Sequence, residues 1–363
     1  MTTPYADLPP ERYWRSGVAD VHATGLSGLY QKKFDIARKD RIATAGSCFA
    51  QHVARHLTKH DFNVLDAETS PLDLPDEVAR RFGYRIYSGR YGNLYTARQL
   101  LQLLKDAASG TVRPEDVWEK NGRFYDGLRP SVEPDGLASP EEVMAHRREH
   151  LGFVDELFSN VDVLIFTLGL TEAWVHRASG AVYPICPGVI AGAYDPAEHA
   201  FKNFEFDEIL ADMLEVNEIL KARNGNFRMM VTVSPVPLTA TASGDHVLAA
   251  TTFSKSTLRA VAGSLRNRCD NIDYFPSYEI ITSPSSRGMF YEPNLRSVTE
   301  IGVETVMKTL LSQHAGDKPA EAAPKERPAP EKDDAPRKAK RGGGKKKKDD
   351  LVCEEILLEA FAR

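Results

Sequence analysis

The stretch RIATAGSCFAQHVARHLTK (residues 41–59) joins a continuous apolar run to a helical pattern through one Gly-Ser pair. The run 41–45 lacks the alternation of a half-exposed strand, which is typical of a strand buried on both faces of a sheet. Helical periodicity follows over 48–59. A buried strand that leads into a helix is the repeating unit of parallel α/β sheets.

The same alternation continues along the chain. Further apolar runs predict strands at 62–65, 161–169, 227–235 and 271–275, and helical periodicity predicts helices at 96–107, 140–158, 205–223, 254–267 and 298–313. Helices between strands imply crossover connections, so we expect an α/β fold with a mainly parallel central sheet covered by helices on both sides. In such folds ligand sites lie beyond the carboxyl ends of the strands.

We expect three regions. Residues 1–314 carry the α/β pattern, and residues 315–350 are rich in Ala, Pro, Lys, Glu and Gly without apolar periodicity, which predicts a disordered charged linker. Residues 351–363 predict a short amphipathic helix with Leu351, Ile356, Leu357 and Phe361 near one face. A short apolar helix on a tether is typical of a docking peptide, either for another protein or for a groove on its own domain.

Composition excludes several classes of function. The net charge of −5 gives no bias towards nucleic acid, although the basic run 337–348 is either a transient contact for it or a solvated segment. Neither a leader nor a membrane span is expected, so we predict a cytoplasmic protein. The four cysteines lie far apart and no phosphate-binding glycine loop occurs, so we expect no metal and no cofactor. His146 and His150, four residues apart, are interpreted as a solvated or partly packed helix face.

Ser47 is the predicted reaction centre. Gly46 permits a tight turn after the first strand, and the serine hydroxyl then lies at the amino end of a helix, which favours a developing anion. The alternative role for Ser47 is a helix N-cap. Cys48 is a rival nucleophile because a thiolate is intrinsically stronger, but we expect its side chain to pack inside.

Several blocks of sequence together resemble one family. They occur in order over roughly residues 10 to 313 and are GSCFA (46–50), RYGNLYTARQLLQLL (90–104), TLGLTEAW (167–174), VSPVPLTAT (233–241), FSKSTLRAVAG (253–263) and YFPSYEI (274–280). In combination they resemble the GSCFA-domain family, which is grouped with the SGNH, or GDSL-like, hydrolases. The resemblance implies a flavodoxin-like three-layer sandwich and serine chemistry on acyl esters.

The resemblance also implies roles for individual residues. Ser47 matches the nucleophile, and Gly92 with Asn93 resembles a loop that supplies oxyanion donors. Gly169 and Thr171 lie in a second such loop. Asn93 is the preferred side-chain donor, and the backbone N–H groups of Ser47 and Gly92 are alternatives to side-chain donors.

The chain differs from the family pattern at the residues that would supply the general base. GDSL-type enzymes place aspartate and histidine three residues apart near the end of the domain, whereas this chain has Asn294 and Ser297 there. A serine without a base is a poor nucleophile at neutral pH. His246 and Glu172 are our candidates for the base, with His176 as a further one.

We therefore predict an SGNH-like serine hydrolase or acyltransferase that acts on ester-linked acyl groups through a Ser47 acyl-enzyme. Its partner is an acylated small molecule or a glycan, since the resemblance implies a polysaccharide substrate, and no specific nucleic acid is expected. The alternative is a catalytically diverged domain that binds carbohydrate or protein, with its C-terminal helix docking on a protein partner. Serine at position 297, in place of histidine, favours this alternative.

Overall fold

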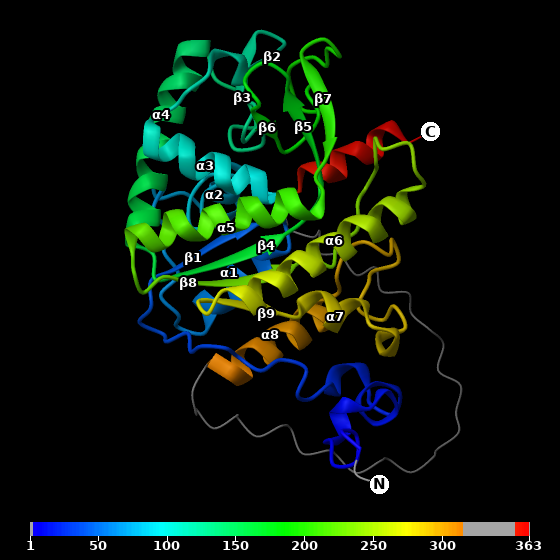
Figure 1. The fold of residues 1–363 in the computed structure, drawn as a ribbon. Helices are drawn as coiled ribbons and strands as arrows, with labels where there is room; N and C mark the ends of the chain where they lie inside the picture. The colour runs from blue at the N-terminus through cyan, green and yellow to red at the C-terminus, as the bar shows by residue number, and fades with distance from the viewer. Residues whose placement is uncertain (1–2, 315–352, 363) are drawn as a thin grey trace, which may run out of the picture.

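The computed structural model describes residues 3–314 and 353–362. The described residues form a central parallel sheet with the strand order β1-β4-β8-β9. Its strands are β1 (Ile42–Gly46), β4 (Val163–Leu168), β8 (Arg228–Val233) and β9 (Ile272–Phe275). Figure 1 shows helices on both sides of this sheet. The predicted α/β fold class is confirmed.

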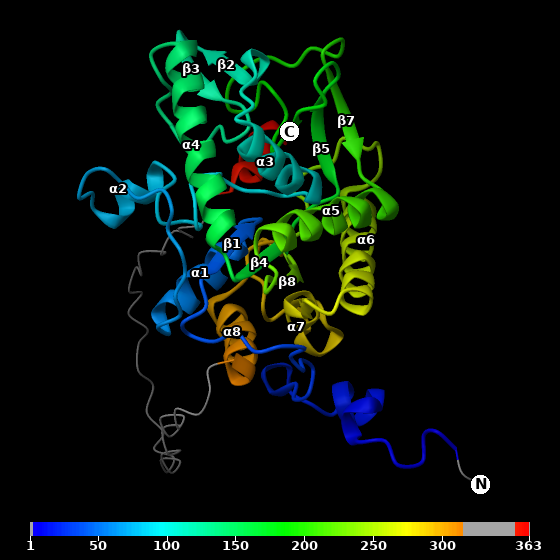
Figure 2. The same cartoon turned by 60° about the vertical axis from the view of Figure 1, so that its left-hand side comes forward.

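Helices cover the two faces of the sheet. Residues of α3 (Ala97–Ser109), α4 (Pro140–Asn160), α5 (Phe206–Arg223) and α6 (Val247–Arg268) belong to the larger apolar core. On the other face α1 (Ala50–Lys59), α7 (Ser277–Thr282) and α8 (Glu300–His314) form a second core. The turned view in Figure 2 places α1 and α8 together on one side of the strands.

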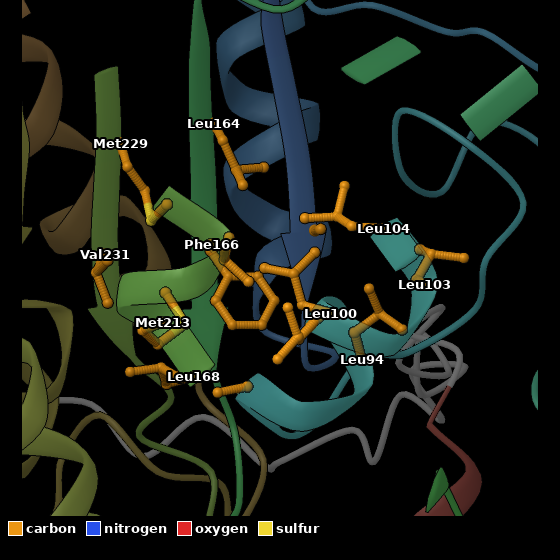
Figure 3. Packing of buried hydrophobic residues seen from close by; sticks show 14 of the residues in the cluster. Leu94, Leu100, Leu103, Leu104, Leu164, Phe166, Leu168, Met213, Met229 and Val231 are labelled. Carbon is orange, nitrogen blue, oxygen red and sulfur yellow. The ribbon is translucent and has the colours of Figure 1, made fainter. Parts of the chain in front are cut away.

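Side chains of the central strand β4 belong to both cores. Leu164, Phe166 and Leu168 belong to the larger core, whereas Val163 and Ile165 belong to the second. Figure 3 shows the first set packed among side chains of β8, α3 and α5. Burying each such side chain contributes about 1.5–3 kcal/mol. Burial on both faces explains why the strand reads as a continuous apolar run.

The run at 62–65, predicted as a strand, is not one. A single parallel bridge joins Val64 to Ile42. The backbone N–H of Leu65 donates to the carbonyl of Ile42, but that of Asn63 donates to Arg38. Pairing with β1 therefore ends after one residue, and the prediction of a strand was wrong.

Two antiparallel units were not predicted. β2 (Val117–Lys120) and β3 (Arg123–Asp126) form a hairpin, and a second sheet has the order β6-β5-β7. The latter comprises β5 (Glu172–His176), β6 (Val182–Tyr183) and β7 (His199–Asn203). β5 starts directly after the loop at the carboxyl end of β4, so this sheet stands beside the predicted site (Figure 1).

The remaining described elements are short. They are α2 (Asp76–Arg81), a π-helix (Arg15–Ala19) and 3-10 turns at Pro10–Arg12, Ala23–Gly25, Pro114–Asp116, Pro284–Ser286 and Glu354–Phe361. The predicted linker 315–350 lies outside the described residues. Among the described helices, none has the length and apolar character needed to cross a membrane.

The C-terminal segment (residues 353–362) contains the last of these turns, where a short amphipathic helix was predicted. Its orientation is the opposite of the predicted one. Glu354 and Glu355 are buried, whereas Ile356, Leu357 and Phe361 are exposed. Leu351, the fourth residue of the predicted apolar face, lies outside the described residues.

Candidate active site

The turn after β1 depends on glycine. Gly46 has a φ of +133°, and a Cβ there would lie 2.7 Å from the backbone nitrogen of Thr167 on β4. The N–H of Ser47 then donates to the carbonyl of Thr167 at 3.1 Å. Ser47 is thereby fixed at the carboxyl end of two adjacent strands, as predicted for a parallel sheet.

Ser47 is not the N-cap of the following helix. The N-cap of α1 is Phe49, and no side chain caps this helix. The Ser47 side chain is buried, with 3% of the residue exposed, and its Oγ has no hydrogen-bond partner among the described residues. A buried hydroxyl without a hydrogen bond carries a desolvation cost, and the hydroxyls of Thr44 and Thr167 on the adjacent strands share this property.

Gly169, predicted to lie in an oxyanion loop, lies against Ser47. A Cβ at position 169 would stand 2.8 Å from the Cβ of Ser47 and 3.1 Å from the carbonyl oxygen of Tyr95. The N–H groups of Gly169 and Leu170 both donate to that Tyr95 carbonyl at 2.9 Å. The absence of a side chain at 169 therefore leaves room for Ser47 and brings Tyr95 beside it.

Asn93 is tied to the same turn. The hydroxyl of Tyr87 donates to the carbonyl oxygen of Ser47 at 3.1 Å and is also hydrogen-bonded to Asn93 Oδ1. The N–H of Leu94 donates to the carbonyl of Gly46 at 2.9 Å. The structure therefore brings the predicted donor Asn93 next to the predicted nucleophile.

Two neutral donors converge on one oxygen in this place. Asn93 Nδ2 donates to Oε2 of Glu354, and the Tyr95 hydroxyl donates to the same oxygen at 2.9 Å. Ser131 Oγ donates to the other oxygen, Oε1. Glu354, from the C-terminal segment, is 2% exposed. A Cβ on the predicted residue Gly92 would lie 3.9 Å from Oε1. The carboxylate of Glu354 stands here for any oxyanion of similar size.

The backbone N–H of Ser47, one of the two alternative donors, is engaged elsewhere, as are two N–H groups of the second predicted loop. Besides the Ser47 and Gly169 N–H groups described above, the N–H of Thr171 donates to Ser254 Oγ at 3.1 Å. Thr171 itself is fully buried. The donors that converge on Glu354 are side chains, the Ser47 N–H is not among them, and the Gly92 N–H stays a prediction.

Lys255 is a site residue that sequence reasoning missed. Its side chain is 1% exposed, and Nζ donates to the carbonyl of Gly169 at 2.6 Å. Burial lowers its pKa to about 8, against the opposing effect of Glu355. The block FSKS (253–256) was part of the family resemblance, and it was the signal that could have pointed to this lysine.

Arg296 is a second missed residue. Asn294 Nδ2 donates to Ser297 Oγ at 3.0 Å, and the N–H groups of Arg296 and Ser297 donate to Asn294 Oδ1. This turn projects Arg296 inwards, where Nη2 donates to Glu355 at 3.1 Å. A guanidinium thus enters the site from the turn formed by Asn294 and Ser297.

Cys48 is buried, as the sequence predicted. A hydrogen bond to Cys353, together with burial, raises the pKa of the Cys48 thiol. Conversely, the hydrogen bond from Cys48 and the nearby Arg296 lower the pKa of Cys353, whose Sγ lies 3.9 Å from Arg296 Nη2. The proton therefore stays on Cys48, which does not favour it as a nucleophile.

None of the predicted bases hydrogen-bonds to Ser47 Oγ in the described structure. His246 is exposed as the N-cap of α6 and accepts from the N–H of Leu248 at 3.1 Å. Glu172 begins β5 and accepts from the Thr241 hydroxyl at 2.7 Å, and burial raises its pKa. His176 ends β5, where Nδ1 contacts Ser179 Oγ at 2.8 Å.

A buried polar network supports the loops that carry the donors. Glu68 accepts from the N–H of Arg90 at 3.2 Å and lies 2.6 Å from His150 Nδ1. Arg129 Nη1 donates to the carbonyl of Arg90 at 3.0 Å. The network thus connects the segments before Asn93 and Ser131. His150, predicted on a solvated or partly packed face, is fully buried, so that interpretation was wrong.

Two of the cavities among the described residues are larger than the others. One of about 150 Å³ lies beside β5 and is lined by Glu172, Trp174, Leu238, Glu355 and Leu358 among others. A larger one of about 670 Å³ lies between the N-terminal segment and residues of α6 and α7, away from Ser47. The described residues hold no group of three or more His, Cys, Asp and Glu side chains suited to a metal.

The fold and the site define an α/β protein with a serine at the turn after its first strand and neutral donors beside it. The GSCFA family matches residues 41–310, and the chain belongs to this family. Searches of curated proteins and of solved structures gave no match to the chain.

Proposed function

We propose that this protein is a serine hydrolase or acyltransferase of SGNH type that acts on ester-linked acyl groups. The observation that carries the proposal is the convergence of Asn93 Nδ2 and the Tyr95 hydroxyl on a single oxygen of Glu354, beside Ser47. Paired neutral donors suit an oxygen that becomes negative only during acyl transfer.

The chemistry follows from these positions. Ser47 Oγ attacks the carbonyl carbon of the ester, and the carbonyl oxygen becomes an oxyanion held by Asn93 and Tyr95. The ester bond then breaks, the alcohol leaves with a proton, and an acyl-serine remains. Water completes hydrolysis, whereas an acceptor hydroxyl completes transfer to a second molecule.

Lys255 is the base in this proposal, in place of His246 or Glu172. Its contact with Gly169 places it next to the residue that touches Ser47. With a pKa of about 8, a substantial fraction of Lys255 is neutral in mildly alkaline solution and can accept the serine proton. A polysaccharide as the acylated substrate is implied by the family resemblance alone and stays a prediction.

The test is labelling of the purified full chain with a fluorophosphonate, analysed by mass spectrometry. We expect labelling at Ser47, its loss in Ser47→Ala, and its retention in Cys48→Ala. Ser234→Ala is the matched control, because Ser234 is also a buried serine at the end of a central strand. Asn93→Ala should slow labelling by about 100-fold, as expected for the loss of one oxyanion donor.

Each measurement is made in the natural chain and also in Glu354→Ala, because Glu354 fills the hole. Labelling that is absent at Ser47 in both chains contradicts the proposal. It would favour the diverged binding domain, in which no base contacts the Ser47 hydroxyl.

A further inference from the structure

We propose that the domain surface beside Ser47 is a binding site for the acidic C-terminal segment of this same chain, with Glu354 as the anchoring carboxylate. Its domain-side contacts are Asn93, Tyr95 and Ser131 around Glu354 and Arg296 at Glu355. That this occupancy excludes substrate rests on the proposed function, whereas the binding itself does not.

The inverted orientation of the segment is the first argument. Apolar side chains normally face the protein, yet Ile356, Leu357 and Phe361 are exposed while Glu354 and Glu355 are buried. Burying a carboxylate is unfavourable unless hydrogen bonds or opposite charges compensate. The segment is therefore recognised through its acidic residues.

The compensation for the two carboxylates is specific. Three hydroxyl and amide donors reach Glu354. Glu355 pairs with Arg296 at 3.1 Å and lies in the field of Lys255. Glu354 is thus held by neutral donors and Glu355 by a cation. Because two consecutive carboxylates each have their own hydrogen-bonding partners, these side chains form a specific recognition site.

Further contacts fix the register of the segment. Cys353 Sγ lies 3.8 Å from the Tyr95 hydroxyl and 3.9 Å from Arg296 Nη2, and the Cys353 thiol raises the pKa of Cys48. On the other side Leu358 packs against the apolar cluster of the antiparallel sheets that contains Trp118 and Tyr183. Figure 1 shows the segment, in red, close to these strands. The site thus contacts the Cys-Glu-Glu sequence at 353–355 and the apolar residue Leu358, whereas Ile356 between them is exposed.

This occupancy has a direct consequence for the proposed reaction. Glu354 Oε2 takes the position of the oxyanion, so an ester carbonyl and this carboxylate cannot bind at once. Release of the segment must then precede catalysis. The variants Glu354→Ala and Glu359→Ala, compared in two different measurements, test the binding of the segment separately from its effect on catalysis.

The binding test uses the two thiols as reporters in the full chain. Treatment with diamide, a mild thiol oxidant, should give a Cys48–Cys353 disulfide, detected as a cross-linked peptide by mass spectrometry without reduction. Glu354→Ala and Ser131→Ala should lower the rate of cross-linking by about tenfold or more, since each removes hydrogen bonds to a charged group. Glu359→Ala, an exposed acidic residue of the same segment, should leave the rate unchanged.

The catalytic consequence is measured as the rate of fluorophosphonate labelling. Glu354→Ala should accelerate labelling of Ser47 by about tenfold or more, and Glu359→Ala should not. Absence of the cross-link in the natural chain, or equal cross-linking in Glu354→Ala, overturns the binding proposal. Cross-linking that depends on Glu354, with no labelling of Ser47 in any variant, supports the binding site and overturns only the proposed function.

Discussion

Lys255 Nζ donates a hydrogen bond of 2.6 Å to the carbonyl oxygen of Gly169, the residue that lies against Ser47. This bond ties α6 to the loop at the end of β4. It also holds the amine in a place where burial lowers its pKa to about 8. A lysine in that position is charged at neutral pH and loses its charge a little above it.

The first prediction concerns the pH dependence of Ser47 labelling. The neutral amine is the base, so the labelling rate should rise with pH and level off above the pKa of Lys255, which burial holds below the ordinary lysine value. Lys255→Met should reduce the rate and remove this dependence, measured in the Glu354→Ala background. Arg268→Met, which changes an exposed basic residue of the same helix, serves as the control. A midpoint unchanged in Lys255→Met would contradict the assignment.

The second prediction concerns the room that Gly169 leaves. Gly169→Ala would bring a Cβ to 2.8 Å from the Ser47 Cβ, and neither that serine nor the Tyr95 carbonyl can move without disturbing the sheet edge. We expect a loss of about 1–3 kcal/mol in the free energy of unfolding, which is usual for overpacking, together with slower labelling. Urea denaturation measures the first effect.

Gly152→Ala is the matched control for that substitution. Gly152 lies within α4, and a Cβ there meets nothing within 4 Å. The change should stabilise the protein by roughly 0.5–1 kcal/mol, because alanine is the better helix former. Equal effects of the two substitutions would show that crowding at Gly169 is unimportant.

The third prediction concerns the pair formed by Arg296 and Glu355. Both side chains are buried, and removing one partner of a buried ion pair typically costs about 3–5 kcal/mol. In Arg296→Met the segment can avoid this cost by leaving its binding site, so Cys48–Cys353 cross-linking should fall. Arg287→Met, which changes an exposed arginine of a neighbouring loop, should leave cross-linking unchanged. Similar cross-linking in both variants would exclude Arg296 as an anchor.

The turn at Ser47 could be predicted because its signals are local. A buried strand, a glycine and a helix follow one another within residues 41–59, so the sequence order is also the spatial order. The residues around Ser47 could not be predicted in this way, because the hydrogen-bonded pair Asn93 and Glu354 is separated by 261 residues in the sequence. The hydrophobic periodicity of a sequence does not predict such long-range contacts, because they arise from the packing of the whole domain.

The antiparallel strands and Arg296 were missed for related reasons. β6 has only two residues, and β5 is partly buried along most of its length, so neither shows a clear period. Arg296 lies in an irregular turn held by Asn294 and Ser297, and no local sequence pattern distinguishes an inward-facing arginine there from an exposed one. The C-terminal segment was predicted from its apolar face, whereas its acidic residues make the contacts.

The last prediction concerns stability and His150. Burial and the nearby Arg129 lower the pKa of His150 to about 3, despite the opposing effect of Glu68. In the unfolded chain a histidine has a pKa of about 6.5, so below that pH the unfolded state binds a proton that the folded state does not. The contribution of His150 to stability must therefore fall as pH decreases from 7.5 towards 3. Glu68 contributes in a lower range, because its folded pKa is about 2 and carboxylates in unfolded chains titrate near 4.3.

Comparison of pH 7.5 with pH 5 separates His150 from Glu68, which is ionised in the folded chain at both pH values. Burial raises the pKa of Asp116 to about 6 and that of Glu355 to about 7, so both carboxyls also titrate in this range, but they do so in the natural chain and in a His150 variant alike. At pH 5 the protonation of His150 in the unfolded chain costs the folded state about 2 kcal/mol by this linkage. His150→Gln should be less stable than the natural chain at pH 7.5, since the contact with Glu68 changes, but it should lose about 2 kcal/mol less on acidification. His60→Gln, at an exposed position on the C-cap of α1, should keep the natural slope. An unaltered slope in His150→Gln, measured by urea denaturation at both pH values, would mean that His150 is protonated in the folded protein.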